Sequence, residues 1–333
     1  MIRTIKFFAP AILLFSGVAS AQYTDEINTN RPGQSMSAFA VGQTVFQIES
    51  GINAVHDKHS ILNTESTGAA ADLTIRYGVF MEQLEVIVDM QYRFDQYHDA
   101  IYSYSRNDFS RFTIGAKYLI YDPDKNYKPK LNLYSWKANH KFKWHSLIPA
   151  VAVYAGANVI GKNNPYTFPT DKLSGKVMAI THNHFGKWVW INNFIYDKAG
   201  TDYPSTGWIT TLTRGFNAKW SGFLEFQAYQ SDYYGDGIIR GGAAYLLGTN
   251  VQLDASVSTN FKDTPSILYG GVGFSWRFDA DYRDIKLPGE GDREDLLKED
   301  QKKQKKEKED RKKERQEMID NIKQQNGTAT PTE

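Results

Sequence analysis

EQLEVIVDMQYRFD, residues 82–95, is the stretch from which the fold of this chain is read. One set of alternate residues is apolar: Leu84, Val86, Val88, Met90, Tyr92 and Phe94. The other set is polar apart from Ile87: Glu85, Asp89, Gln91, Arg93 and Asp95. A period of two predicts a β-strand with one apolar face. The stretch exceeds the usual strand of about 5–6 residues and suits a tilted membrane strand of roughly 9–11.

A strand that crosses lipid needs a closed barrel, because its backbone N–H and C=O groups would otherwise lack partners. Similar stretches recur, so the sequence predicts an all-β fold, an antiparallel transmembrane β-barrel of about twelve strands within residues 43–278. The predicted strands are 43–54, 68–79, 82–95, 109–121, 146–159, 174–185, 187–197, 206–216, 218–229, 237–247, 249–260 and 267–278. Strands 187–197 and 206–216 alternate poorly, so their bounds are the weakest.

The predicted connections alternate in length. Short links such as 80–81 and 217 alternate with longer polar links such as 55–67 and 160–173. Bacterial outer-membrane barrels pair short periplasmic turns with longer external loops. We therefore expect an outer-membrane location, surrounded by lipid, with both termini in the periplasm. Residues 122–145 break the alternation, and their aromatic residues among lysines predict a short interfacial helix or, alternatively, an extra hairpin below the bilayer.

The two ends of the chain differ from the barrel region. Residues 1–21 combine a basic start, an apolar run and the cleavage pattern Ala19-Ser20-Ala21, which predicts a secretory signal peptide. Residues 22–42 are polar and are expected in the periplasm or inside the lumen as a plug. Residues 279–333 are rich in Glu, Asp, Lys and Arg, with opposite charges four residues apart as in Glu299 and Lys303. We expect a charged periplasmic tail, partly helical or disordered.

Several classes of function are excluded or find no support. A net charge of +1 argues against a nucleic-acid partner. No G-x-S-x-G or P-loop pattern is present, so we expect no enzyme and no cofactor. His182 and His184 share a strand face, but a third metal ligand is not apparent. They are interpreted as lumen residues near the rim, and no metal site is predicted.

Charged residues are expected to point into the lumen. The alternation assigns twelve of them to this face: Glu49, Asp72, Arg76, Glu85, Asp89, Arg93, Arg111, Lys117, Glu225, Arg240, Asp254 and Arg277. Either they line a permeation path or they fill a narrow barrel as cross-strand ion pairs, and a barrel of this size allows both. A register symmetric about Phe80-Met81 predicts that Arg76 lies opposite Glu85 and pairs with it. We expect a narrow or partly plugged pore.

The segment TNRPGQS at residues 29–35 and the first strand's FQIESG at residues 46–51 resemble a known family. They are similar to the Gram-negative outer-membrane barrels grouped as "putative meta-pathway of phenol degradation" or simply as "transporter" proteins, over residues 24–278. The resemblance implies an outer-membrane β-barrel that passes small solutes, aromatic compounds among them, and implies no catalytic residues. The final strand, which ends Trp276-Arg277-Phe278, is similar to the terminal aromatic signal of such barrels.

Two function hypotheses remain at this point. The first is a porin-like channel or transporter for a small-molecule solute. The second is a structural or scaffolding barrel of an envelope-assembly complex, whose tail binds a periplasmic protein or the cell wall.

Overall fold

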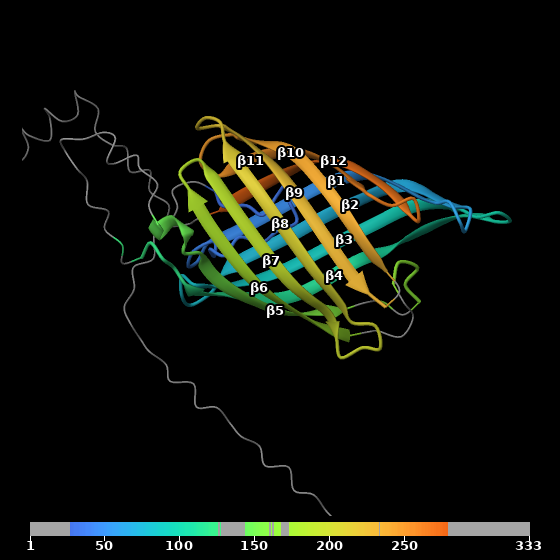
Figure 1. The fold of residues 1–333 in the computed structure, drawn as a ribbon, viewed down its shortest axis with the longest axis horizontal. Coiled ribbons are helices and arrows are strands. Elements are labelled where there is room, and N and C mark those ends of the chain that lie inside the picture. The colour runs from blue at the N-terminus through green and yellow to red at the C-terminus, as the bar shows by residue number, and fades with distance from the viewer. Residues whose placement is uncertain are drawn as a thin grey trace, which may run out of the picture. The chain divides into compact units, whose positions relative to one another are not determined.

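The computed structural model describes residues 27–278, apart from residues 126, 128–143, 160, 162, 168–172 and 233. Twelve strands, each antiparallel to its sequence neighbours, form a barrel that closes where β1 pairs with β12 (Figure 1). The predicted antiparallel twelve-stranded barrel is confirmed. The signal peptide, the charged tail and most of the expected interfacial helix lie outside the described residues. No helix within the described ranges is long and apolar enough to cross a membrane.

The strands follow the predicted order. Their bounds are β1 Phe46–His59, β2 Thr64–Gly78, β3 Leu84–His98, β4 Ser103–Tyr121, β5 Ala150–Val159, β6 Leu173–Phe185, β7 Trp188–Ala199, β8 Ser205–Gly215, β9 Trp220–Ser231, β10 Gly235–Leu246, β11 Val251–Asn260 and β12 Ser266–Phe278. A short 3-10 helix, η1 Trp144–Leu147, precedes β5. The end of the barrel that carries the turns β2–β3, β6–β7, β8–β9 and β10–β11 is called the turn side, and the opposite end the loop side.

Strands β1 to β4 extend farther toward the loop side than the sequence indicated. The prediction of a loop at residues 55–67 is wrong, because β1 continues to His59 and β2 begins at Thr64. Likewise β4 begins at Ser103, where a loop was expected. Ladder hydrogen bonds satisfy the backbone beyond the apolar belt as well as within it, so the polar residues of these hairpins remain paired. In Figure 1 the two long hairpins project beyond the other strands.

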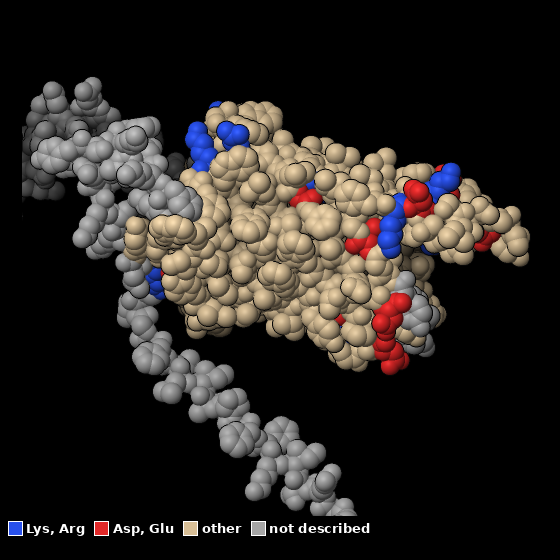
Figure 2. Space-filling model, viewed as in Figure 1, with Lys and Arg blue, Asp and Glu red and all other residues tan. Residues whose placement is uncertain are grey.

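Alternation places apolar side chains on the outer wall. On β3, Val86 and Phe94 are exposed while Glu85, Ile87 and Asp89 are buried. Figure 2 shows that this face of the molecule is largely free of charged side chains between its two ends. A wide apolar belt bounded by charge is the surface that a lipid bilayer requires of a barrel.

The register between β2 and β3 differs from the symmetric one. Arg76 lies opposite Ile87, and Glu85 lies opposite Gly78. The connection is wider than Phe80-Met81, because Met81 accepts a hydrogen bond from the Leu84 amide and closes a turn before β3 begins. Arg76 and Glu85 are therefore diagonal neighbours. They share the inner face, and their long side chains still meet, since diagonal partners lie only about 7–8 Å apart.

Candidate functional site

The site consists of the inner wall of the barrel and the chain segment that lies against it. The structure buries nine of the twelve charged residues that the alternation assigned to the lumen. The other three, Arg93, Arg111 and Arg240, keep side-chain exposures of 12%, 30% and 13%. None of the twelve is on the lipid-facing wall, but they fall into separate groups with different partners.

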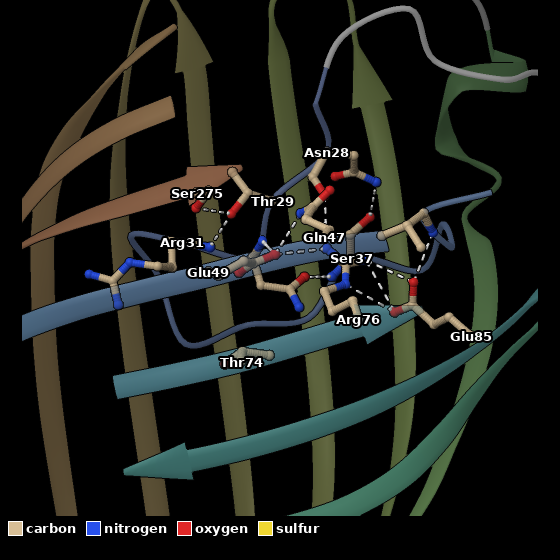
Figure 3. A network of polar contacts seen from close by, with 12 residues as sticks. Asn28, Thr29, Arg31, Ser37, Gln47, Glu49, Thr74, Arg76, Glu85 and Ser275 are labelled. Atoms are coloured by element: carbon tan, nitrogen blue, oxygen red, sulfur yellow. Dashed lines mark hydrogen bonds and ion pairs between the residues drawn. The ribbon is translucent and has the colours of Figure 1, made fainter. Parts of the chain in front are cut away.

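The first group is a buried network centred on Arg76. Its Nη1 lies 3.1 Å from Oε1 of Glu49, and its Nη2 lies 3.0 Å from Oε2 of Glu85. The Nζ of Lys117 lies 2.7 Å from Oε1 of Glu85, so each charge has an opposite neighbour. Figure 3 shows Arg76 between the two carboxylates on the inner face of β1 to β3. Because the side chains have almost no exposure, removing one partner would leave a buried charge unpaired.

A second group lies farther toward the loop side. Arg111 pairs with Asp89, with Nε 2.8 Å from Oδ2. Asp72 accepts hydrogen bonds from Asn53 at 2.6 Å and from Gln91 at 2.7 Å. This carboxylate is therefore satisfied mainly by neutral amides.

A third group lies near the loop-side ends of β1, β3 and β4. Arg93 pairs with Asp57 and Asp95, and Arg106 also pairs with Asp95. The hydroxyl of Tyr166, from the loop after β5, donates to Asp95 at 3.2 Å. Burial and the Asp95 carboxylate raise the pKa of Tyr166 to about 12, so the hydroxyl stays protonated. The sequence pattern does not predict Asp57 and Arg106 as lumen residues, because both lie in strand ends that it assigns to loops. Asp95 lies on the polar face of residues 82–95 but is not among the twelve predicted residues.

The N-terminal segment, residues 27–42, runs inside the barrel at its turn side (Figure 1). Arg31 anchors it, with Nε 3.2 Å and Nη2 3.1 Å from the two oxygens of Asp254. Gly51 and Gly273 are register partners on β1 and β12, and a Cβ on either would collide with the Arg31 guanidinium. The two glycines thus leave a socket in the wall for this side chain. Sequence reasoning did not single out Arg31.

Side chains of the wall also bind the backbone of the N-terminal segment. Glu225 accepts hydrogen bonds from the amides of Gln34 and Ser35 at 2.9 and 3.2 Å. Asn193 accepts from the Met36 amide at 2.6 Å and donates to the Met36 carbonyl at 2.9 Å. These contacts satisfy backbone groups that form no strand ladder.

Further contacts of the same kind come from the Arg76 network. Glu85 accepts a hydrogen bond from the Val41 amide at 2.8 Å. Lys117 donates to the Ser37 and Phe39 carbonyls at 2.6 and 2.9 Å. The network of ion pairs therefore also binds the N-terminal segment.

An apolar cluster supports the segment from the other side. Ala38 is buried among residues of β3 to β6, and Met36 and Phe39 pack against the same cluster. The wall residues of this cluster are Ile87, Leu119, Ala150, Ala152, Tyr154, Met178 and Ile180. Inward-facing apolar residues therefore have a partner in the segment, which is why they do not face an aqueous lumen.

Two cavities of about 200 Å³ each lie in the lumen. The loop-side cavity is lined by residues such as Asn53, Arg111 and Tyr229, with Gln34 from the segment. The turn-side cavity is lined by residues 27–33 of the segment and by wall residues such as Thr213 and Phe223. On β9 the loop-side lining begins at Gln227 and the turn-side lining ends at Phe223. Glu225, which binds the segment, lies between them in sequence, so the segment crosses the lumen between the two cavities.

The two histidines have different surroundings. His182 lies against the segment, with Nδ1 3.2 Å from the Ser37 hydroxyl and its ring edge-on to Phe39 at 4.9 Å. His184 is exposed toward the turn side. In the part of the chain that the structure describes, no group of three or more His, Cys, Asp or Glu side chains could hold a metal ion.

Solved structures of other barrels resemble this one, among them the following three. An outer membrane channel from Pseudomonas putida F1 is 12% identical with a TM-score of 0.49, over 74% of this chain and 99% of that chain. The NanC porin is 8% identical with a TM-score of 0.40, over 68% of this chain and 98% of that one. A deltaS2 mutant of the TodX monoaromatic hydrocarbon channel is 8% identical with a TM-score of 0.38, over 73% of this chain and 92% of that one.

Sequence comparison identifies the family. No curated protein matches the chain. The sequence profile of the family described as "Putative MetA-pathway of phenol degradation" matches residues 29–278. This range covers the barrel and most of the described N-terminal segment, and it includes both motifs on which the resemblance was based. The chain therefore belongs to this family of outer-membrane β-barrels.

Proposed function

We propose that the protein is an outer-membrane channel for small solutes, aromatic compounds among them, and that residues 22–42 restrict the passage. The observation that carries this proposal is the pair of lumen cavities on the two sides of the N-terminal segment. Strand number leaves both a filled and an open interior possible for a twelve-stranded barrel, so the cavities are the observation that favours a passage. Here cavities occur on both sides of a segment that enters from one end.

The charged residues of the inner wall fit the same proposal. All twelve, from Glu49 to Arg277, are proposed to line or border the route, and the segment is bound through some of the same groups. An inner wall that pairs its own charges can bind a polypeptide segment by hydrogen bonds without a large net field. The short turns are assigned to the periplasm, which places both termini there and lets the segment enter the lumen from the periplasmic side.

Single-channel recording in planar bilayers tests the proposal. We compare the mature chain with a variant lacking residues 22–42 and with Arg31→Ala, which removes the anchor to Asp254. The full chain is expected to conduct weakly, and the deletion is expected to raise the conductance several-fold. Arg31→Ala is expected to switch frequently between the low conductance of the full chain and the higher conductance of the deletion variant, because the segment loses its bidentate contact with Asp254.

Two results would contradict the proposal. If neither the full chain nor the deletion variant conducts, the barrel is not a channel. If both conduct equally, residues 22–42 do not restrict the passage. The scaffolding alternative depends on the tail at 279–333, and nothing among the described residues favours it. Copurification of a stoichiometric periplasmic partner that is lost on truncation after Asp281 would revive that alternative.

A further inference from the structure

Arg240 is a largely buried cation, with a side-chain exposure of 13%, and it forms no hydrogen bond to any described residue. It stands on β10 directly opposite Glu225 of β9. Its Nε nevertheless lies 3.9 Å from Oε1 of Glu225, which is beyond hydrogen-bonding distance. This Nε is inaccessible to solvent and has no partner within the described ranges. A buried guanidinium with unused donors is costly unless something else binds it.

Glu225 does not take that role in the structure, because its other contacts hold the carboxylate 3.9 Å from the Arg240 Nε. Its Oε2 accepts hydrogen bonds from the amides of Gln34 and Ser35 and from the Thr211 hydroxyl at 2.7 Å. Its Oε1 accepts a hydrogen bond from the side-chain amide of Gln227 at 2.6 Å. The carboxylate thus binds the N-terminal segment and its own wall, and Arg240 receives only its longer-range attraction.

The Arg240 side chain, which is 13% exposed, lines the loop-side cavity. The other two arginines of the lining are already paired, Arg93 with Asp57 and Asp95 and Arg111 with Asp89. Asp72, the carboxylate of the lining, is engaged by two amide donors. An anion entering this cavity would therefore meet Arg240 as the cation with unused donors.

The rest of the lining is suited to an aromatic ring. Val55, Ile238, Tyr229 and Tyr269 contribute apolar and aromatic surface to the same cavity. Its volume of about 200 Å³ is below the roughly 300–1,000 Å³ of sites for drug-sized ligands. The cavity therefore suits a ligand of about one ring.

We propose that the loop-side cavity binds a small aromatic carboxylate, whose carboxylate is held by the Arg240 guanidinium and whose ring contacts Tyr229 and Ile238. The planar fork of arginine matches a carboxylate and can donate two parallel hydrogen bonds. The site lies before the N-terminal segment as seen from the loop side. The inference rests on the proposed channel function, because the site selects the solute on that route.

Isothermal titration calorimetry on the full mature chain in detergent tests the site without requiring conduction. The probe is sodium benzoate, and benzamide is the neutral molecule of nearly the same shape. The variants are Arg240→Gln, Arg240→Lys and the control Arg214→Gln. Arg214 is exposed, stacks on Trp188 at 4.9 Å and lines neither cavity.

Benzoate is expected to bind the wild type, and benzamide at least ten-fold more weakly. Arg240→Gln should lower benzoate affinity by about ten- to hundred-fold, the loss typical of a charged hydrogen bond. Arg240→Lys keeps the charge without the forked guanidinium and should lose less benzoate affinity than Arg240→Gln. Arg214→Gln should bind benzoate as the wild type does.

Equal affinity for benzoate and benzamide, or no change in Arg240→Gln, would overturn the inference. If Arg240→Gln does not fold, the benzoate-to-benzamide ratio of the wild type and the Arg240→Lys variant still decide it. A barrel that conducts but does not prefer benzoate refutes this inference alone. Preferential benzoate binding by a barrel that never conducts refutes the channel function alone.

Discussion

The two sides of the lumen bind the N-terminal segment by different chemistry. The inner wall of β1 to β4 buries seven charged side chains: Glu49, Asp72, Arg76, Glu85, Asp89, Asp95 and Lys117. On β5 to β8 the described side chains that are buried are all neutral, among them Tyr154, Ile180 and Asn193. These two regions are called the charged wall and the neutral wall.

The difference shows how one segment can be held between unlike surfaces. The charged wall acts mainly on the backbone, through Lys117 to two carbonyls and Glu85 to the Val41 amide. The neutral wall supplies most of the apolar cluster in which Ala38 is buried and against which Met36 and Phe39 pack, and the charged wall adds only Ile87 and Leu119 to it. Charge placed opposite those apolar side chains would be desolvated without compensation. The division of the lumen thus follows the polarity of the segment itself.

The largest expected effect separates the two walls directly. Arg76→Met should lower the free energy of unfolding by about 3–5 kcal/mol, because Glu49 and Glu85 lose their shared buried partner. The matched change on the neutral wall, Ile180→Met, should cost less than about 1.5 kcal/mol, because it conserves volume and exposes no charge. Urea titration in lipid vesicles, followed by tryptophan fluorescence, measures both. The absence of coupling in a double-mutant cycle of Arg76→Met with Glu85→Gln would contradict the assignment.

The outer faces of the two walls should, in contrast, behave alike. Val88 on β3 and Leu212 on β8 both have apolar register partners, Ile114 and Leu224. Each is expected near the middle of a span of roughly 9–11 residues. Replacement of either by Arg should cost about 2–4 kcal/mol in vesicles, because lipid meets both walls at the same depth. If Val88→Arg folds as well as the wild type, the assignment of its face is wrong.

A smaller effect is expected for the polar contact on the neutral wall. Asn193→Leu removes both hydrogen bonds to Met36 and should cost about 1–3 kcal/mol, from two bonds of ordinary strength. Faster deuterium exchange of the Met36 amide should accompany the loss. Asn192→Leu is the control, because Asn192 lies next to it in the chain and contacts Thr181 instead of the segment. Equal exchange rates in both variants would show that Asn193 does not hold the segment.

The smallest effect is expected where the charged wall borders the loop-side cavity. Asp89→Asn weakens the pair with Arg111, whose side chain is 30% exposed. Solvent screens such a pair, so the cost should be below about 1 kcal/mol in the same urea titration. A cost as large as that of Arg76→Met would mean that this region is as dry as the Arg76 network.

The sequence by itself determined the twelve strands and which side of most of them faces lipid. Lipid imposes one rule on every spanning strand, so the outward residues of β3, such as Val86 and Phe94, follow a period of two that can be read without a structure. The same rule identified six of the seven buried charges of β1 to β4, all except Asp95. The alternation is weaker on β7 and β8, because the neutral wall turns apolar residues such as Ile209 inward, yet the predicted bounds of both strands agree with the structure to within two residues.

The tertiary structure alone decided register and partners. Arg76 meets Glu85 diagonally because the turn before Leu84 is wider than the two residues that a symmetric register assumes. The socket for Arg31 exists because barrel closure sets Gly51 opposite Gly273, residues far apart in the chain. The unused donors of Arg240 likewise depend on Glu225 being engaged by the segment. Periodicity assigns a side chain to a face, but turn geometry and closure determine which side chains meet on it.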